Sequence, residues 1–159
     1  MARTAAVASK RSRAPYQRDV NVLIALAGPL HVHHEIAHAW FERVGQQSWS
    51  TCPLTPLTFV RISSNTKIIP TAVSPHAAVQ ALGEIVALAG HVFWADDLQV
   101  NDLASFASRA LTGHRQVTDA YLIELAKRHK GKVATLDAGL ADLFPQTERA
   151  RFVTFIGAV

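Results

Sequence analysis

The stretch Lys132-Val133-Ala134-Thr135-Leu136-Asp137 decides the fold, because it places a short apolar strand directly before an acidic residue. The expected strand, Lys132–Leu136, follows a helical pattern over Val117–His129 that stops at Gly131. A helix that leads into a buried strand is the repeating unit of α/β proteins, whose sheets are mainly parallel. Ligands of such sheets bind beyond the carboxyl ends of the strands, which is where Asp137 falls.

The same alternation of helical and strand-like patterns extends over the rest of the chain. By composition, further strands are expected at Val20–Ala27, Ser48–Cys52, His91–Trp94 and Arg151–Ile156. Helices are expected at residues 32–44, Leu54–Ser64, 74–89 and Asn101–Ala110, and a helical turn at Gly139–Leu143. Ser74-Pro75 is a strong helix start, because a capping serine precedes a proline at the first helical position. The sequence predicts one α/β domain with a mainly parallel sheet flanked by helices.

Three aspartates lie beside apolar runs, each at the expected end of a strand or start of a helix. They are Asp19, Asp119 and Asp137, in a chain with only 12 acidic residues among 159. A carboxylate at the edge of a core is costly unless it is paired or binds a cation. Two carboxylates about 6 Å apart repel by roughly 3 kcal/mol at an effective dielectric near 20. A divalent-metal site is therefore the first hypothesis, against the simpler one in which each aspartate only caps a helix.

The positive charge of the chain is concentrated at its N-terminus. Residues 1–18 contain five Lys and Arg and no acid, so the net charge of +4 leaves −1 for the remaining residues. We expect residues 1–17 to form a basic, disordered extension, which would favour anionic partners in a salt-dependent way. A lone cysteine, Cys52, rules out an intramolecular disulfide and is typical of a reducing compartment, here the cytoplasm. No apolar stretch approaches the ~20 residues of a membrane span.

Several blocks of the chain, taken in order, resemble VapC-type PIN-domain ribonucleases over about residues 18–157. The blocks are Asp19-Val20-Asn21-Val22-Leu23-Ile24-Ala25-Leu26, His31-Val32-His33-His34 with Trp40-Phe41, Thr51-Cys52-Pro53-Leu54-Thr55, His91-Val92-Phe93-Trp94, Thr118-Asp119-Ala120-Tyr121-Leu122 and Ala134-Thr135-Leu136-Asp137-Ala138-Gly139-Leu140. Any one of them alone would be weak, but their order and rough spacing together are specific.

The resemblance implies a PIN-like three-layer domain over residues 18–159. It implies a Mg²⁺- or Mn²⁺-dependent endoribonuclease, with Asp19, Asp119 and Asp137 as catalytic and metal-binding acids. Asn21 and Thr118 match the family's polar residues beside these acids. The family further implies an RNA substrate, a cognate antitoxin and a homodimer, and thus the toxin of a toxin–antitoxin pair.

The chain departs from the family pattern at two places. The family's second acid should fall near Thr55–Leu57, where Pro56 occupies the expected position. The family's first strand is usually apolar, whereas residues 14–18 here include Gln17 and Arg18. The family also has a helix at Val20–Ala27, where composition indicates a strand.

Two alternative functions stay open. The missing acid would suit a catalytically weakened PIN-like module that binds RNA or protein. The pentapeptide His34-Glu35-Ile36-Ala37-His38 matches the His-Glu-x-x-His motif of zinc metallopeptidases, which places two imidazoles one helical turn apart. The simpler interpretation of this motif is an exposed helix face with solvated histidines.

Overall fold

The computed structural model describes residues 15–101, 111–114 and 116–157. The strands are β1 (Tyr16–Arg18), β2 (Trp49–Thr51), β3 (His91–Phe93), β4 (Lys132–Thr135) and β5 (Val153–Phe155). The helices are α1 (Val20–Ala27), α2 (His34–Arg43), the 3₁₀ helix η1 (Gly45–Gln47), α3 (Leu54–Ser63), α4 (Pro75–Val86), α6 (Gln116–Arg128), α7 (Ala138–Ala141) and α8 (Gln146–Phe152). The expected helix Asn101–Ala110 lies almost wholly outside the described residues.

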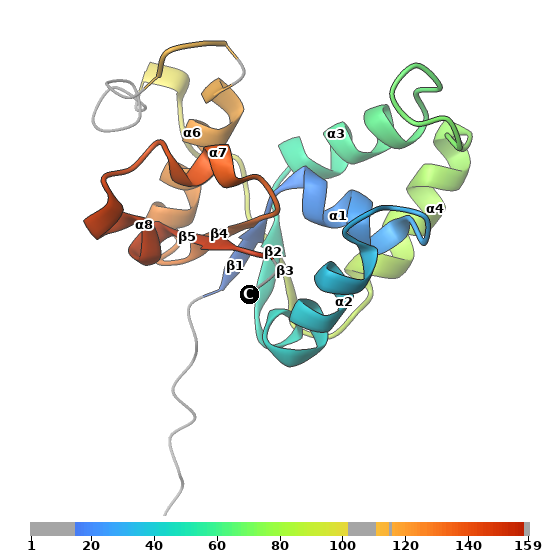
Figure 1. The fold of residues 1–159 in the computed structure, drawn as a ribbon, viewed down its shortest axis with the longest axis horizontal. Helices are drawn as coiled ribbons and strands as arrows, with labels where there is room; N and C mark the ends of the chain where they lie inside the picture. Colours follow the sequence, from blue (N-terminus) through green and yellow to red (C-terminus); the bar gives the residue numbers. More distant parts are fainter. Residues whose placement is uncertain (1–14, 102–110, 115, 158–159) are drawn as a thin grey trace, which may run out of the picture.

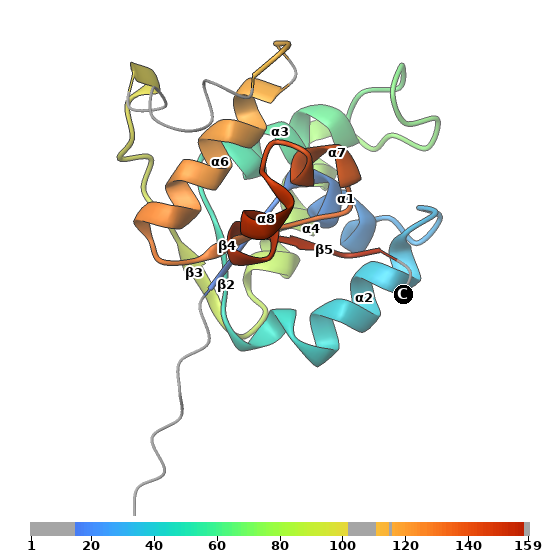
Figure 2. The ribbon, with the colours of Figure 1, turned by 60° about the vertical axis from the view of Figure 1, so that its left-hand side comes forward.

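The five described strands form one parallel sheet in the order β3-β2-β1-β4-β5. Helices α1 to α4 lie on one side of this sheet, and α6, α7 and α8 lie on the other (Figures 1 and 2). This three-layer α/β architecture confirms the predicted fold class. Because all strands run the same way, their carboxyl ends meet at a single edge, with β1 in the middle.

Each face of the sheet carries its own hydrophobic core. On the α1–α4 side, Trp49 and Ala134 pack with apolar side chains of these helices. On the α6–α8 side, Val133 and Val153 pack with buried residues of α6 and with Leu143. Neighbouring residues of β4, Val133 and Ala134, thus serve opposite cores, as alternation along a strand requires. No helix of the described residues is long and apolar enough to cross a membrane.

The central strand β1 is polar and yet buried. The Gln17 amide donates to Cys52 Sγ at 3.8 Å, and its oxygen accepts from Ser50 Oγ at 3.1 Å. The Arg18 guanidinium lies between two rings, 3.9 Å from the Phe41 centroid and 3.6 Å from that of Trp49. Burial lowers the pKa of Arg18 to about 9. Side-chain hydrogen bonds and cation–π contacts therefore replace the apolar packing expected of a central strand. The strand begins at Tyr16, two residues before the expected domain start.

Two expectations about secondary structure are wrong. Val20–Ala27 is a helix, as the family resemblance implied, and not the strand that composition indicated. Val22, Leu23 and neighbouring apolar residues are buried, so the segment shows no polar face from which a helical period could be read. The strand expected at Arg151–Ile156 is shorter, because α8 occupies Gln146–Phe152. The Ser74 cap is confirmed by its hydrogen bond from Ala77 N, although α4 ends at Val86 rather than Ala89.

Candidate functional site

The carboxyl edge of the sheet brings together two of the three predicted aspartates. Asp19 follows β1 and Asp137 follows β4, and these strands are neighbours in the sheet. The Asp19 amide donates to Ala134 O at 3.0 Å, which continues the β1–β4 pairing to the edge. Each aspartate is also the N-cap of the helix that follows, α1 for Asp19 and α7 for Asp137. Both acids therefore lie where helix N-termini favour negative charge.

Three donors surround the Asp19 carboxylate. Its Oδ1 accepts from Val20 N at 2.6 Å, while Oδ2 accepts from Asn21 Nδ2 and Thr135 Oγ1, both at 2.9 Å. Burial raises the pKa of Asp19, and the charge of Asp137 adds to the rise, whereas these hydrogen bonds oppose it. The Asp19 side chain is thus held in one orientation, and Asn21 contacts it directly.

Asp119 joins this site from the opposite layer. It lies in the first turn of α6, a helix that packs against both β1 and β4. Burial, and after it the charges of Asp19 and Asp137, raise the pKa of Asp119 to about 6. Asp119 is therefore the third candidate acid of this edge, in a helix packed against the two strands that Asp19 and Asp137 follow.

The donor set suits a hard divalent cation. All the donors are oxygens, and three carboxylates that repel one another gain from a cation between them. Within the described part of the chain, no three His, Cys, Asp or Glu side chains form a group that could hold a metal ion by themselves. Mg²⁺ and similar ions are usually held by one or two direct carboxylates plus several waters, so a three-ligand cage is not required. The residues present thus fit such an ion by their chemistry, with water completing its coordination.

Two other predicted positions need comment. Thr118 is an exposed residue within the first turn of α6, which begins at Gln116. Pro56 lies half-buried in the first turn of α3, the helix that follows β2 at the same edge of the sheet. The first amides of a helix have no partner within it, so a proline is tolerated there. The chain places no carboxylate at this point.

The histidine motif has a structural role that differs from both sequence interpretations. His34 Nδ1 lies 2.7 Å from Ala25 O, and His38 Nε2 lies 3.0 Å from Leu26 O. These carbonyls belong to the last turn of α1, where helix carbonyls lack partners. Each half-buried imidazole therefore has one ring nitrogen engaged by a backbone carbonyl. They bind α2 to the C-terminal end of α1.

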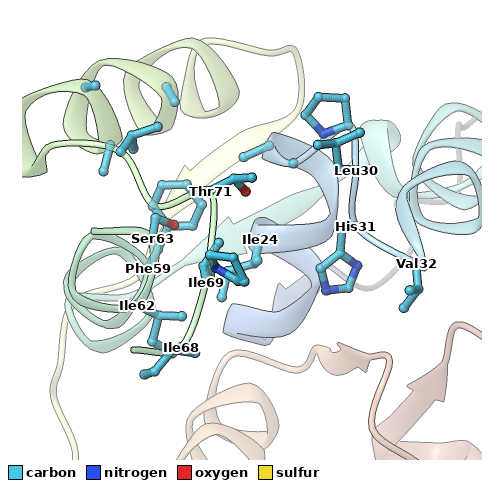
Figure 3. A pocket seen from close by; sticks show the side chains of 18 residues that line it. Ile24, Leu30, His31, Val32, Phe59, Ile62, Ser63, Ile68, Ile69 and Thr71 are labelled. Atoms are coloured by element: carbon cyan, nitrogen blue, oxygen red, sulfur yellow. The ribbon is translucent and has the colours of Figure 1, made fainter. Parts of the chain in front are cut away.

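A large apolar groove lies on the α1–α4 side of the molecule. It has a volume of about 760 Å³ and lies between the end of α1, the segment after it, α3, the loop to α4, and the first turns of α4. Figure 3 shows Ile24, Phe59 and Ile62 in the groove, with Leu30, Val32 and Ile68 around it. None of the three acids lines it. Nothing in the sequence pattern singled out this surface.

The site residue that sequence reasoning missed is Thr135. It was noted only as part of the block before Asp137, yet its hydroxyl contacts Asp19, Asn21 and the Asp137 amide. Its apolar neighbours made it look like an ordinary strand residue. A hydroxyl residue two places before a predicted metal-binding acid, at the end of a strand, was the available signal.

Comparison with solved structures agrees with this architecture. The crystal structure of PAE2754 from Pyrobaculum aerophilum has a TM-score of 0.57 at 16% sequence identity, and the match covers 95% of this chain and 92% of that one. At that identity the likeness concerns the fold alone. The fold and the acidic carboxyl edge define a PIN-like domain.

Sequence comparison gives the family. Ribonuclease VapC39 of Mycobacterium tuberculosis strain H37Rv is 44% identical over 124 residues, which are 78% of this chain and 89% of that protein. Ribonuclease VapC38 of the same strain is 41% identical over 128 residues, 80% of this chain and 89% of that protein. Ribonuclease VapC29 of the same strain is 40% identical over 125 residues, which are 79% of this chain and 87% of that protein. No protein-family model matches the chain. The chain belongs to the VapC family of PIN-domain ribonucleases.

Proposed function

We propose that this protein is a divalent-metal-dependent endoribonuclease of the cytoplasm that hydrolyses RNA phosphodiester bonds as the toxin of a toxin–antitoxin pair. Asp19, Asp119 and Asp137 are its catalytic and metal-binding acids. The observation that carries the proposal is that Asp19 and Asp137 follow neighbouring strands at one edge of the sheet, with Asp119 in a helix packed against both strands, in a VapC-family chain. Mg²⁺ or Mn²⁺ is the expected ion, because the donors are carboxylate oxygens.

Each acid has its own part in this scheme. Asp19 is fixed by three hydrogen bonds and is the most constrained of the carboxylates, which suits a direct ligand. Asp137 is exposed, and its Oδ1 accepts only from Gly139 N at 2.8 Å among the described residues, so its other oxygen can face an ion or a phosphate. Asp119, in the first turn of α6, is the candidate to take a proton from an attacking water. A bound divalent ion would supply water activation and neutralise charge on the phosphoryl oxygens.

The test is cleavage of a fluorescent RNA under defined metal conditions. The wild-type protein should cleave with Mg²⁺ or Mn²⁺ and stop with EDTA, and the changes Asp19→Asn, Asp119→Asn and Asp137→Asn should each abolish cleavage. Asp142→Asn is the matched control, because Asp142 is an exposed aspartate whose carboxylate pairs with Arg149 at 2.8 Å. Full activity of the Asp119→Asn protein would refute the site assignment. RNA binding without turnover in the wild type would instead identify the weakened binding module that Pro56 suggests.

The apolar groove is our candidate surface for the antitoxin. Leu30 and Val32 at its rim are 81% and 86% exposed, and Ile68 is 58% exposed. Exposed apolar side chains gathered around a groove mark a protein-binding surface more often than a free one. A groove between helices suits an amphipathic helix of a partner, which would place its apolar face inside. A homodimer is expected in addition, and light scattering of the purified protein tests it.

A further inference from the structure

The hydroxyl of Thr135 is the centre of a hydrogen-bond network at the acidic edge. Thr135 is fully buried at the end of β4, beside Asp19 at the end of β1. Thr135 Oγ1 lies 2.9 Å from Asp19 Oδ2, 3.1 Å from Asn21 Nδ2 and 3.0 Å from the Asp137 amide nitrogen. A threonine hydroxyl has one proton to donate and two lone pairs that accept. The three contacts therefore use its full capacity.

The direction of every bond in this network follows from its two backbone amides. The Leu136 amide donates to Asn21 Oδ1 at 3.1 Å, so the Asn21 NH₂ group must point at Asp19 Oδ2 and Thr135 Oγ1. The Asp137 amide also donates to Thr135 Oγ1. With two donors already directed at it, the hydroxyl can send its proton only to Asp19 Oδ2. No other arrangement satisfies all the groups.

We propose that Thr135 is a positioning residue that fixes the Asp19 carboxylate relative to Asp137, so that these two acids bind the cation as one rigid unit. The inference rests on the proposed function. Thr135 links them because it bonds the Asp19 side chain directly and the Asp137 backbone directly, across strands whose residues are 116 positions apart. Groups that orient metal ligands in this way typically change metal affinity or activity 10- to 100-fold when removed.

The test compares Thr135→Val, which loses the hydroxyl, with Thr135→Ser, which keeps it. Thr51→Val is the matched control, because Thr51 is a buried strand threonine whose hydroxyl lies 2.9 Å from His91 Nε2, outside the acidic site. Mn²⁺ affinity is measured by calorimetry on each folded protein, and kcat and KM are measured on RNA. If Thr135→Val does not fold, Thr135→Ala takes its place, because alanine removes the methyl group that would press on the network.

We expect Thr135→Val to bind Mn²⁺ at least about 10-fold more weakly and to lose kcat with little change in KM for RNA. Thr135→Ser should stay within about 3-fold of the wild type, and Thr51→Val should bind Mn²⁺ as the wild type does even if its thermal midpoint falls. Equal Mn²⁺ affinity of Thr135→Val and the wild type would overturn this inference while leaving the proposed function intact. A wild-type protein that neither binds Mn²⁺ nor cleaves RNA would overturn both.

Discussion

Changing Asp119 to Asn should stabilise the metal-free protein at neutral pH while abolishing its activity. Burial, followed by the charges of Asp19 and Asp137, raises the pKa of Asp119 from 3.8 to about 6. In the unfolded chain this carboxyl loses its proton near pH 4, but in the folded protein it keeps the proton to about pH 6. Between these values the folded state binds more protons, so stability falls as the pH rises. Above pH 6 the folded protein bears the full free-energy cost of the ionised Asp119 carboxylate, and an asparagine at this position removes that cost.

The size of this effect follows from the pKa shift. A shift of this size corresponds to about 3 kcal/mol at 1.36 kcal/mol per unit. Asp119 is only half-buried, so we halve the figure for solvent screening and expect about 1.5 kcal/mol. For a domain of this length that is a rise in the thermal midpoint of roughly 3–6 °C. At pH 4 the difference between the two proteins should be much smaller, because Asp119 is then protonated in the folded state.

The assay is thermal unfolding of both proteins in EDTA at pH 4, 5, 6 and 7. Glu84→Gln is the control, because Glu84 is an exposed acid near the end of α4. The control should show no rise in the midpoint at pH 7. An Asp119→Asn protein that is less stable than the wild type at pH 7, or whose advantage is the same at pH 4 and pH 7, would refute the reasoning.

Three further outcomes are expected. Changing Pro56 to Glu should tighten Mn²⁺ binding and make the thermal midpoint more metal-dependent. If calorimetry gives the variant and the wild type equal Mn²⁺ affinities, and the variant only loses about 1 kcal/mol of its free energy of unfolding, the proline serves the start of the helix instead. Changing Arg18 to Met should raise the free energy of unfolding in urea by about 1–2 kcal/mol. The reason is that the buried guanidinium has no hydrogen-bond partner among the described residues and that burial lowers its pKa to about 9. A lower free energy of unfolding would show that the contacts of Arg18 with the rings outweigh the cost of its burial. Changing Ile68 to Ser should weaken antitoxin binding at least about 10-fold without altering RNA cleavage. Val79 is an exposed valine of α4 outside the groove, and Val79→Ser should not weaken antitoxin binding. Equal antitoxin binding by the two variants would exclude the groove as the antitoxin surface.

The sequence predicted the helices whose buried, apolar residues recur at helical spacing, and it failed for the helices that lack this pattern. Helix α2 has one buried face, so its pattern was readable. Helix α1 is apolar almost throughout and gave a strand-like signal. Helix α8 has no buried residue, so it has no apolar stripe and was not predicted. Hydrophobic periodicity arises only when one face of a helix is apolar and the other polar, so it cannot identify a helix whose faces are alike.

The acids of the candidate site could be predicted, but their connections could not. Asp137 was readable because it follows a buried strand, and Asp119 because it lies in the first turn of a helix. The Thr135 network depends on the register that places Arg18 opposite Ala134, and no local pattern encodes a register between distant strands. The buried hydrogen bonds of Gln17 likewise depend on partners that only the folded sheet supplies.

The position of β1 in the middle of the sheet also sets when the site can exist during translation. Asp19 is made early, but Thr135, which holds it, follows 116 residues later. At synthesis rates of 5–20 residues per second, Asp19 waits roughly 6–23 s for that partner. During this time β1 can pair with β2 on one side only, since β4 does not yet exist. A nascent chain on the ribosome, surrounded by RNA, therefore carries only part of its acidic site until Thr135 and Asp137 have been made.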